Sequence, residues 1–468
     1  VALDPHRFKL MASRLDKALA IATGVTVNLN PDGTALVPGE KTKITASISN
    51  NGVGEIQIKQ LKFRGLGQEA SLDVADKMLP GTETTARVEV TTPKSAGFTV
   101  PSSEHLYDGR LFGEPLTAEA ELSVEGISFS AATEIRRDVA PGVEILEVEP
   151  APYVTTPATS QKPLEFKVKL QNHLANPFRG LLRVRGPSLE TGREIDLQPN
   201  EIETSKLVVR SLALTGLRHN STVDITVDLP NPKDPIAKKT VPLVYAAAIV
   251  VPSRKVGYLP SYDKTLERAL SSLGVDARQL TIDDIAKADL SVFHTIVLDN
   301  RPYEAHPELV GLNTRLLKFV EDGGSLVVFY SKTNEWNPDG RRNRPQLAPF
   351  PIILDDDRVT QEDAPVTFLQ PRHPLLNFPN RITQADFANW VQERGLYFPR
   401  EWDPHYTAVL ATSDRREPLL KGGLLVAQYG KGNYIHTSFV WYRQLRAGLP
   451  GGYRMFANLI SYGRRKED

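Results

Sequence analysis

Apolar and polar residues alternate along much of the first half of the chain. Single polar residues separate Ile44, Ala46 and Ile48, and the same period of two returns in residues 118–124. This period is typical of a strand with one buried and one solvent-facing side. Turn signals such as Pro31-Asp32-Gly33 punctuate the stretch. The pattern predicts an antiparallel β-sandwich of roughly seven short strands over residues 25–140.

A second stretch with the same period follows. Residues 164–170 and 223–227 alternate in the same way, which predicts another sandwich over residues 141–248. Asn172 follows Leu170 two places on, as Asn50 follows Ile48. We therefore expect two immunoglobulin-like β-sandwiches in tandem. Convergence of two unrelated sandwiches on a common strand pattern is the alternative.

Strand-like and helix-like patterns alternate after residue 248. Residues 255–259, 295–298 and 326–329 have the pattern of short strands, and the segments between them carry apolar residues at helical spacing. Thr281 and Asp284 have the spacing of a capping box. This alternation predicts a parallel sheet with helices on its faces over residues 249–468. Regularity is lost between residues 331 and 406, which is typical of functional loops or disorder.

Residues 9–23 have the spacing of an amphipathic helix. Leu10, Leu15 and Leu19 fall near one face, and Gly24 follows where a helix would end. We interpret residues 1–24 as a linker helix whose apolar face needs a partner. That partner is either a domain upstream of this sequence or the β-sandwich that follows.

Composition and charge exclude several classes of function. The 468 residues include 56 basic and 56 acidic side chains, without the positive excess typical of nucleic-acid-binding proteins. No apolar run reaches the roughly 20 residues that a membrane-spanning helix needs. The chain has no cysteine, so disulfides, thiolate nucleophiles and cysteine zinc sites are impossible. We expect neither nucleic-acid binding nor a membrane span.

Ser331 and His436 are the candidate catalytic residues, because each falls at the end of a predicted strand of the last domain. A nucleophilic serine at such a position needs small neighbours that relieve its strained turn. Tyr330 and Lys332 flank Ser331 instead. We interpret the pair as degenerate triad positions and predict no catalytic residue in the chain. A cryptic Ser–His hydrolase remains an alternative.

The four tryptophans are the candidate carbohydrate-binding residues. All four fall in the last domain. Each ring either offers its face to a sugar or fills the core, and we favour core packing because tryptophan is mostly buried on average. The tryptophans are Trp336, Trp390, Trp402 and Trp441.

No metal site is predicted, since the acidic run 355–357 lacks the spaced, glycine-containing loop of a calcium site.

The last domain resembles the class I glutamine amidotransferase-like fold, a flavodoxin-like fold also seen in ThuA-type proteins. The resemblance rests on the predicted strand order, on Gly323-Gly324-Ser325 and on residues 432–436, Gly-Asn-Tyr-Ile-His. The amidotransferases carry a cysteine at the elbow and a His-Pro-Glu triplet on the late strand. This chain has neither, because it lacks cysteine and Thr437-Ser438 follow His436. The resemblance implies a degenerate amidotransferase-like domain.

The whole chain resembles the long C-terminal region of bacterial multidomain PIG-L/LmbE-type deacetylases. Residues 36–40 (Leu-Val-Pro-Gly-Glu), 373–377 (His-Pro-Leu-Leu-Asn), 389–397 and 448–454 carry the resemblance. The family removes N-acetyl groups from amino-sugar conjugates with a zinc ion held by a His-Pro-Asp-Asp-type motif. The only near match, His306-Pro307-Glu308, lacks the paired aspartates. The resemblance implies a noncatalytic accessory region without a cofactor of its own, with zinc only in a catalytic domain absent from this chain.

The resemblance implies a substrate-binding or scaffolding role. Its partners would be the upstream catalytic domain and a glycan ligand, and its location periplasmic or secreted. An independent carbohydrate- or protein-binding module is the alternative that the residues leave open.

Overall fold

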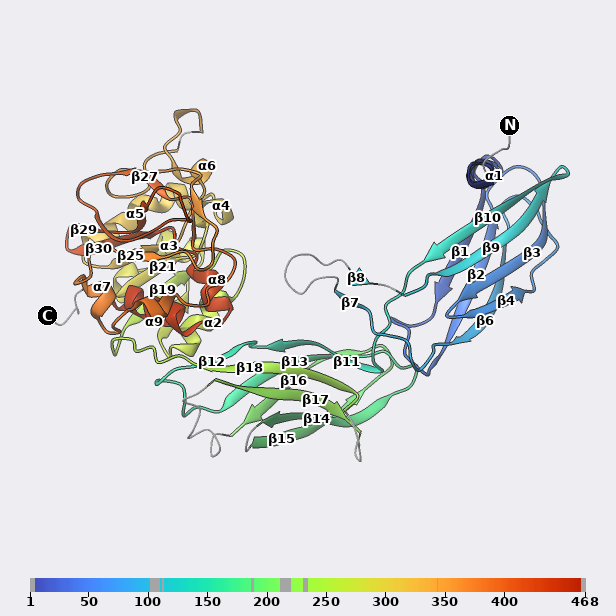
Figure 1. Ribbon diagram of the computed structural model, residues 1–468, viewed down its shortest axis with the longest axis horizontal. Coiled ribbons are helices and arrows are strands. Elements are labelled where there is room, and N and C mark those ends of the chain that lie inside the picture. Colours follow the sequence, from blue (N-terminus) through green and yellow to red (C-terminus); the bar gives the residue numbers. More distant parts are fainter. Residues whose placement is uncertain are drawn as a thin grey trace.

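The computed structural model describes residues 5–101, 110–111, 113–186, 189–210, 220–229, 235–342 and 344–463. Strands dominate the chain up to residue 245, and strands and helices alternate after it (Figure 1). The protein is therefore a β-rich, multi-part molecule with several separate sheets, as the sequence predicts at this coarse level.

The first β unit consists of two antiparallel sheets. The side chains that alternate inward from both sheets form one hydrophobic cluster, which includes Ile44, Leu61 and Leu122. The three-stranded sheet has the order β1 (Val25–Pro31), β2 (Lys41–Asn50) and β6 (Glu83–Thr91). The five-stranded sheet contains β10 (Ile127–Ile135), β9 (Leu116–Val124), β3 (Ile56–Gly65), β4 (Gln68–Leu72) and β5 (Lys77–Met78), and a separate pair joins β7 (Val100–Pro101) to β8 (Arg110–Leu111).

The second β unit repeats this division into three and five strands. Its own cluster includes Phe166, Leu182 and Ile225. The smaller sheet has the order β11 (Val143–Glu149), β13 (Leu164–Asn172) and β16 (Ile202–Val209). The larger sheet has the order β12 (Tyr153–Thr155), β18 (Ala237–Tyr245), β17 (Ser221–Asp228), β14 (Phe178–Gly186) and β15 (Leu189–Leu197), and only β12 and β18 pair in parallel.

Two buried asparagines occupy matching positions in the two β units. Asn50 ends β2 and Asn172 ends β13, and both side chains are fully buried. Each Oδ1 accepts a hydrogen bond from the backbone N–H two residues later, at 3.1 Å in Asn50 and 2.9 Å in Asn172. Each Nδ2 donates to the carbonyl four residues later, at 2.9 Å and 3.0 Å. The spacing noted in the sequence thus marks the same turn built twice.

An eight-stranded sheet forms the centre of the α/β unit. Its first five strands, β20 (Asp276–Gln279), β19 (Lys255–Leu259), β21 (Thr295–Leu298), β22 (Ser325–Val328) and β30 (Gly432–Thr437), are parallel to one another. The last three, β29 (Leu420–Tyr429), β28 (Thr407–Thr412) and β25 (Val366–Phe368), are antiparallel. The expectation of a parallel sheet throughout is therefore corrected to a mixed sheet. Short turns join β28, β29 and β30, and such turns allow only antiparallel pairing.

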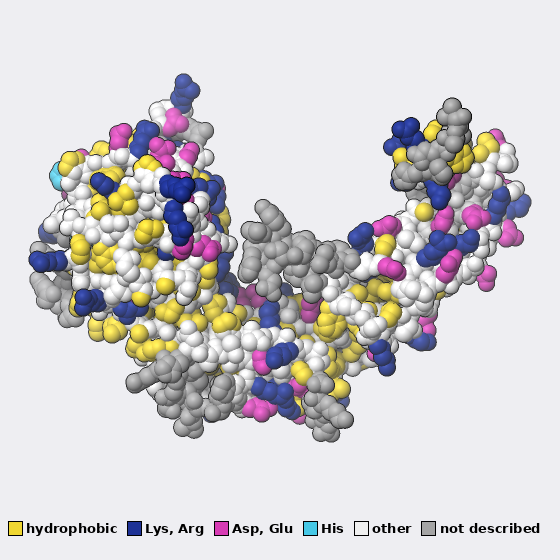
Figure 2. All heavy atoms as spheres, in the orientation of Figure 1, with side chains coloured by type: hydrophobic (Ala, Val, Ile, Leu, Met, Phe, Trp, Pro, Cys, Tyr) yellow, Lys and Arg dark blue, Asp and Glu magenta, His cyan; other side chains and the backbone are white. Residues whose placement is uncertain are grey.

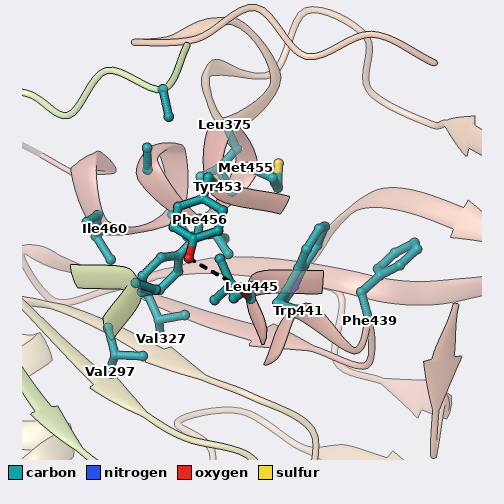
Figure 3. Packing of buried hydrophobic residues seen from close by; sticks show 14 of the residues in the cluster. Val297, Val327, Leu375, Phe439, Trp441, Leu445, Tyr453, Met455, Phe456 and Ile460 are labelled. Atoms are coloured by element: carbon teal, nitrogen blue, oxygen red, sulfur yellow. Dashed lines mark hydrogen bonds between the residues drawn. The ribbon is translucent and has the colours of Figure 1, made fainter. Parts of the chain in front are cut away.

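Helices cover both faces of this sheet. On one face α2 (Thr265–Ser272), α7 (Pro374–Asn377), α8 (Trp441–Arg446) and α9 (Pro450–Ser461) pack against the strands, and Figure 3 shows Phe456 and Leu445 among the buried side chains there. The Tyr453 hydroxyl donates to the Leu445 carbonyl at 3.2 Å within this cluster. The other face carries α3 (Ile282–Lys287), α4 (Pro302–Ala305), α5 (Leu309–Glu321) and α6 (Thr333–Trp336).

The capping box expected from the sequence is confirmed, and a glycine follows a second helix. Thr281 and Asp284 form the expected capping box of α3. Gly323, with φ of 117°, follows α5 in a conformation that residues with a Cβ rarely adopt. The segment 331–406 is less irregular than expected. Besides α6 and α7, its described residues form two 3₁₀ turns, Gly340–Arg342 and Gln384–Phe387. They also form the strand pairs β23 (Ile352–Leu354) with β27 (Pro399–Trp402) and β24 (Arg358–Val359) with β26 (Gly395–Leu396).

The predicted amphipathic helix is α1 (Pro5–Ala22), which lies beside β10 and β1 of the first β unit (Figure 1). Leu19 and Ala20 pack against the cluster of that unit. Of the two partners considered from the sequence, the following β-sheet pair therefore covers one face of the helix.

Candidate functional site

The carboxyl ends of the parallel strands hold both predicted triad positions. Ser331 follows β22, and His436 lies in β30, opposite Val328 in the register of the two strands. Both side chains are fully buried, and neither the Ser331 Oγ nor either ring nitrogen of His436 has a hydrogen-bond partner among the described residues. The Trp336 ring lies 4.9 Å from the His436 ring. Serine and histidine therefore form no nucleophile–base pair in this structure.

Burial also fixes the protonation state of His436. Removal of the ring from water lowers its pKa to about 3, so the imidazole stays neutral at physiological pH. A neutral, fully buried ring with no acceptor for its proton among the described residues is not placed to exchange protons with a substrate.

Two buried carboxyl groups lie at the neighbouring strand ends. Asp299 follows β21 and accepts backbone hydrogen bonds from Ser261 at 3.2 Å and Asn300 at 2.8 Å. Glu335, in α6, accepts from the backbone N–H groups of Lys332 at 2.6 Å and Glu304 at 2.7 Å. Burial raises the pKa of Asp299 to about 6 and that of Glu335 to about 7. The oxygens of both carboxyl groups accept hydrogen bonds from backbone N–H groups of the strand-end loops. Both carboxyl groups therefore link these loops to one another.

Aromatic and charged side chains form the outer rim of the same edge. Arg301 has a left-handed backbone, with φ of 56°, and its guanidinium lies 4.7 Å from the Tyr262 ring centroid. Tyr330 lies between Tyr397, at 6.1 Å between ring centroids, and Tyr442, at 5.9 Å. Tyr330 is only 4% exposed, whereas Tyr262 is 52% exposed. These residues were not among the candidates predicted from the sequence, although Tyr262, Tyr330 and Tyr442 each closely follow a strand of the sheet and the strand-end rule points to them.

The four tryptophans contribute mainly to the core. Trp336, Trp390 and Trp441 are buried, and their indole N–H groups donate to the Ile352 carbonyl, the Asp386 carbonyl and the Thr437 hydroxyl. Trp402 is half-buried against the same cluster as Trp336. Three of the four rings are therefore too enclosed to serve as a flat surface platform, and the structure does not bring all four to one face.

Among the described residues, no three His, Asp or Glu side chains form a group that could hold a metal ion. None of the described helices has both the length and the apolar composition needed to cross a lipid bilayer.

A second candidate site is the outward face of α1. Phe8, Met11 and Leu15 are spaced three and four residues apart, which places them on one side of the helix. Their exposed fractions are 64%, 69% and 61%. In Figure 2, hydrophobic and basic side chains lie next to each other at the position of α1. We call these three residues the α1 stripe.

The end of α1 is fixed to the first β unit. Asn51 donates its backbone N–H to the Gly24 carbonyl at 2.9 Å, and the Thr23 hydroxyl donates to the Leu19 carbonyl at 2.7 Å. A Cβ at Gly52 would lie 2.1 Å from the Thr23 carbonyl oxygen, so only glycine fits there. These contacts hold the helix in one orientation, with the α1 stripe facing outward.

Comparisons with known proteins give little further guidance. No protein-family model and no curated protein match the chain. Partial similarity is found to a cold-adapted β-galactosidase from Rahnella sp. R3, with 16% identity and a TM-score of 0.28 over 43% of this chain and 30% of that one.

Two further solved structures are similar to part of the chain at a comparably low level. A red sea bream transglutaminase has 15% identity and a TM-score of 0.22 over 50% of this chain and 34% of that one. A DUF4785 family protein from Legionella pneumophila has 16% identity and a TM-score of 0.19 over 46% of this chain and 56% of that one. The chain spans less than two thirds of each of the three proteins, and similarity at this level carries no argument about function.

Proposed function

We propose that this chain is the noncatalytic accessory region of a PIG-L/LmbE-type, zinc-dependent N-acetyl-amino-sugar deacetylase, and that it holds the catalytic domain through α1. The α1 stripe is the observation that carries the proposal. Contact with water is unfavourable for large apolar side chains that are grouped on one exposed helix face. A docked partner removes these side chains from water and so lowers the free energy.

Charge around the stripe favours a partner other than a second copy of the chain. Arg7 and Arg14 each directly precede a residue of the α1 stripe and are exposed. In an antiparallel pair of α1 helices these arginines would face those of the other copy, and like charges at such positions destabilise a helix pair. We therefore expect the docking face of the catalytic domain to be apolar with an acidic border.

At a finer level, we propose that the α/β unit is a degenerate amidotransferase-like domain and that the two β units are immunoglobulin-like sandwiches. Numbered along the chain, the first five strands of the mixed sheet have the order 2-1-3-4-5, which is also the order of flavodoxin-like sheets. The matching turns at Asn50 and Asn172 support a common origin of the two β units.

The alternatives differ in what the structure offers them. An independent protein-binding module would use the same α1 stripe, so only the identity of the partner separates it from the leading proposal. A carbohydrate module would need exposed ring faces, and three of the four tryptophans are buried. A Ser–His hydrolase would need contact between Ser331 and His436, whose side chains have no hydrogen-bond partner within the described part of the chain.

Acetate release from an N-acetylglucosamine conjugate tests the proposal. We expect no zinc-dependent release by the chain alone, and release by a separately produced PIG-L/LmbE-type deacetylase domain that changes when the chain is added. Leu15→Lys should abolish the effect of the chain, whereas Leu79→Lys should retain it, because Leu79 is equally exposed, at 60%, but lies outside α1. Zinc-dependent release by the purified chain alone would refute the noncatalytic role.

A further inference from the structure

A cavity of about 450 Å³ lies in the segment 362–394, away from the strand-end edge described above. Its lining includes the apolar side chains of Val366, Phe387 and Trp390 and the exposed carboxylates of Glu362 and Asp363. Arg394 also lines the cavity. The volume is within the usual range of small-molecule sites.

Arg394 is a buried cation without a close ion pair. Only 4% of its surface is exposed, and among the described residues no carboxylate lies within 4.0 Å of its guanidinium, although the charges of Asp363 and Glu362 act on it from farther away. Its Nε donates to the Ala364 carbonyl at 2.9 Å and its Nη1 to the Phe387 carbonyl at 2.5 Å. The described residues provide no acceptor for Nη2. A buried charge usually has an ionic partner, because an isolated one is costly to remove from water.

The surroundings keep this guanidinium charged and in place. Burial lowers the pKa of Arg394 to about 10, which still leaves it protonated at neutral pH. The guanidinium carbon lies 5.1 Å from the centroid of the Trp390 ring, and the indole N–H of Trp390 donates to the Asp386 carbonyl at 3.1 Å. The cation is thus held against an aromatic wall of the cavity.

The loop that carries Trp390 and Arg394 is strained and firmly held. Asn389 and Gln392 both have left-handed backbones, with φ of 59° and 70°. The Gln444 side chain makes two hydrogen bonds to the Val391 backbone. It accepts one from the Val391 N–H at 3.0 Å and donates one to the Val391 carbonyl at 3.2 Å. Strain of this kind persists only where the surrounding structure enforces it, and it is commonest at ligand-binding sites.

We propose that this cavity binds the carboxylate of a small, amino-acid-like ligand. The ligand carboxylate accepts hydrogen bonds from the free Nη2 of Arg394, and its apolar body lies against Val366, Phe387 and Trp390. An ammonium group at the same end of the ligand is attracted by Glu362, which also accepts the Gln392 backbone N–H at 2.5 Å, and by Asp363, which also pairs with Arg415 at 3.1 Å. These two acidic groups also disfavour polyanions. The inference does not rest on the accessory role proposed above.

Titration calorimetry on the full chain tests this assignment with three probes. Phenylalanine carries both charged groups, phenylacetate carries only the carboxylate and phenylalaninamide carries only the ammonium group. We expect phenylalanine to bind most tightly, phenylacetate to bind more weakly and phenylalaninamide not to bind. Absence of binding by both carboxylates at millimolar concentrations, or equal binding by phenylalaninamide, would overturn the proposal.

Variants locate the binding. Arg394→Gln should weaken phenylalanine binding by about tenfold or more, because a charge-assisted hydrogen bond is lost. Because a buried substitution can impair folding, Ala388→Trp provides a second test. Ala388 is exposed and lines the cavity, so the larger side chain should block it. Ala385→Trp is the matched control, since Ala385 is also exposed but does not line the cavity. Equal affinities of these two tryptophan variants would contradict the location.

Discussion

The side chains of His436 and Ser331 are buried without a hydrogen-bond partner among the described residues, at the sheet edge where open α/β sheets bind ligands. The unpartnered ring nitrogens of His436 destabilise the folded state. We expect His436→Phe to raise the free energy of unfolding by about 1–3 kcal/mol, because it removes unsatisfied polar atoms and keeps a ring beside Trp336. Urea unfolding near neutral pH measures this difference. A clear loss of stability would show that the imidazole is satisfied in solution.

The low pKa of His436 also gives a pH dependence. The unfolded chain takes up a proton at this histidine below its ordinary pKa of 6.5, whereas the folded chain does so only near pH 3. Acidification between these values therefore favours unfolding. Comparison of unfolding at pH 7 and pH 5 should show that His436→Phe loses less stability than the wild-type chain.

Asn50 and Asn172 contribute to stability through the turns that they fill. Each side chain bonds several backbone groups that would otherwise be buried without partners. We expect Asn50→Ala and Asn172→Ala each to cost about 2–4 kcal/mol of unfolding free energy. Asn28→Ala is the control, since Asn28 is exposed on β1 and should change stability by less than about 0.5 kcal/mol. Chemical denaturation distinguishes these outcomes, and an effect no larger than that of Asn28→Ala would contradict the account.

Single residues were predictable where a local pattern determines their environment. The spacing of Asn50 and Asn172 after a buried position was visible in the sequence, and so was the place of Ser331 and His436 at strand ends. Their burial was not, because it depends on how the segment 331–406 folds over the edge. Arg394 lies in that same segment, where neither period two nor helical spacing indicates which side chains face inward.

At the scale of elements, some residues of α1 pack within the chain and others are exposed and available to a partner. Leu19 packs against the first β unit, whereas Leu15 faces outward. We expect Leu19→Lys to destabilise the first β unit by about 1–3 kcal/mol and Leu15→Lys to change stability by less than about 0.5 kcal/mol. Thermal unfolding followed by circular dichroism measures both. Comparable losses from the two substitutions would mean that the α1 stripe is already covered.

Elements with a clear period or cap were predicted well. Alternation predicted strands such as β9 and β13, and Thr281 with Asp284 predicted the start of α3. The direction of the last strands was not predictable in this way. An apolar run has the same appearance in a parallel and an antiparallel strand, and the connections that decide between them lie in the segment with the weakest pattern.

At the scale of the whole molecule, the second β unit has a core of its own, as the first does, but it also contributes to a cluster that it shares with the α/β unit. Val154, Ala246 and Ala248 belong to the cluster that contains Leu270 of α2. The hydroxyls of Thr156 and Thr159 both donate to the Ser272 carbonyl, at 2.8 Å and 2.9 Å. These contacts predict that the two parts unfold together.

Scanning calorimetry of the full chain tests this coupling. Asn172→Ala, in the second β unit, and Leu270→Ala, in α2, should lower the same transition, while Asn50→Ala should lower another. Separate transitions for Asn172→Ala and Leu270→Ala would show that the shared cluster does not couple the two parts.

Binding to a deacetylase domain tests the central claim, that α1 holds a catalytic partner, most directly. In sedimentation velocity, a PIG-L/LmbE-type deacetylase domain mixed with the chain should form a complex with the wild-type chain and with Leu79→Lys. Leu15→Lys should abolish it, because the substitution places a charge in the centre of the α1 stripe. Failure of the wild-type chain to form the complex, or an undiminished complex with Leu15→Lys, would contradict the account.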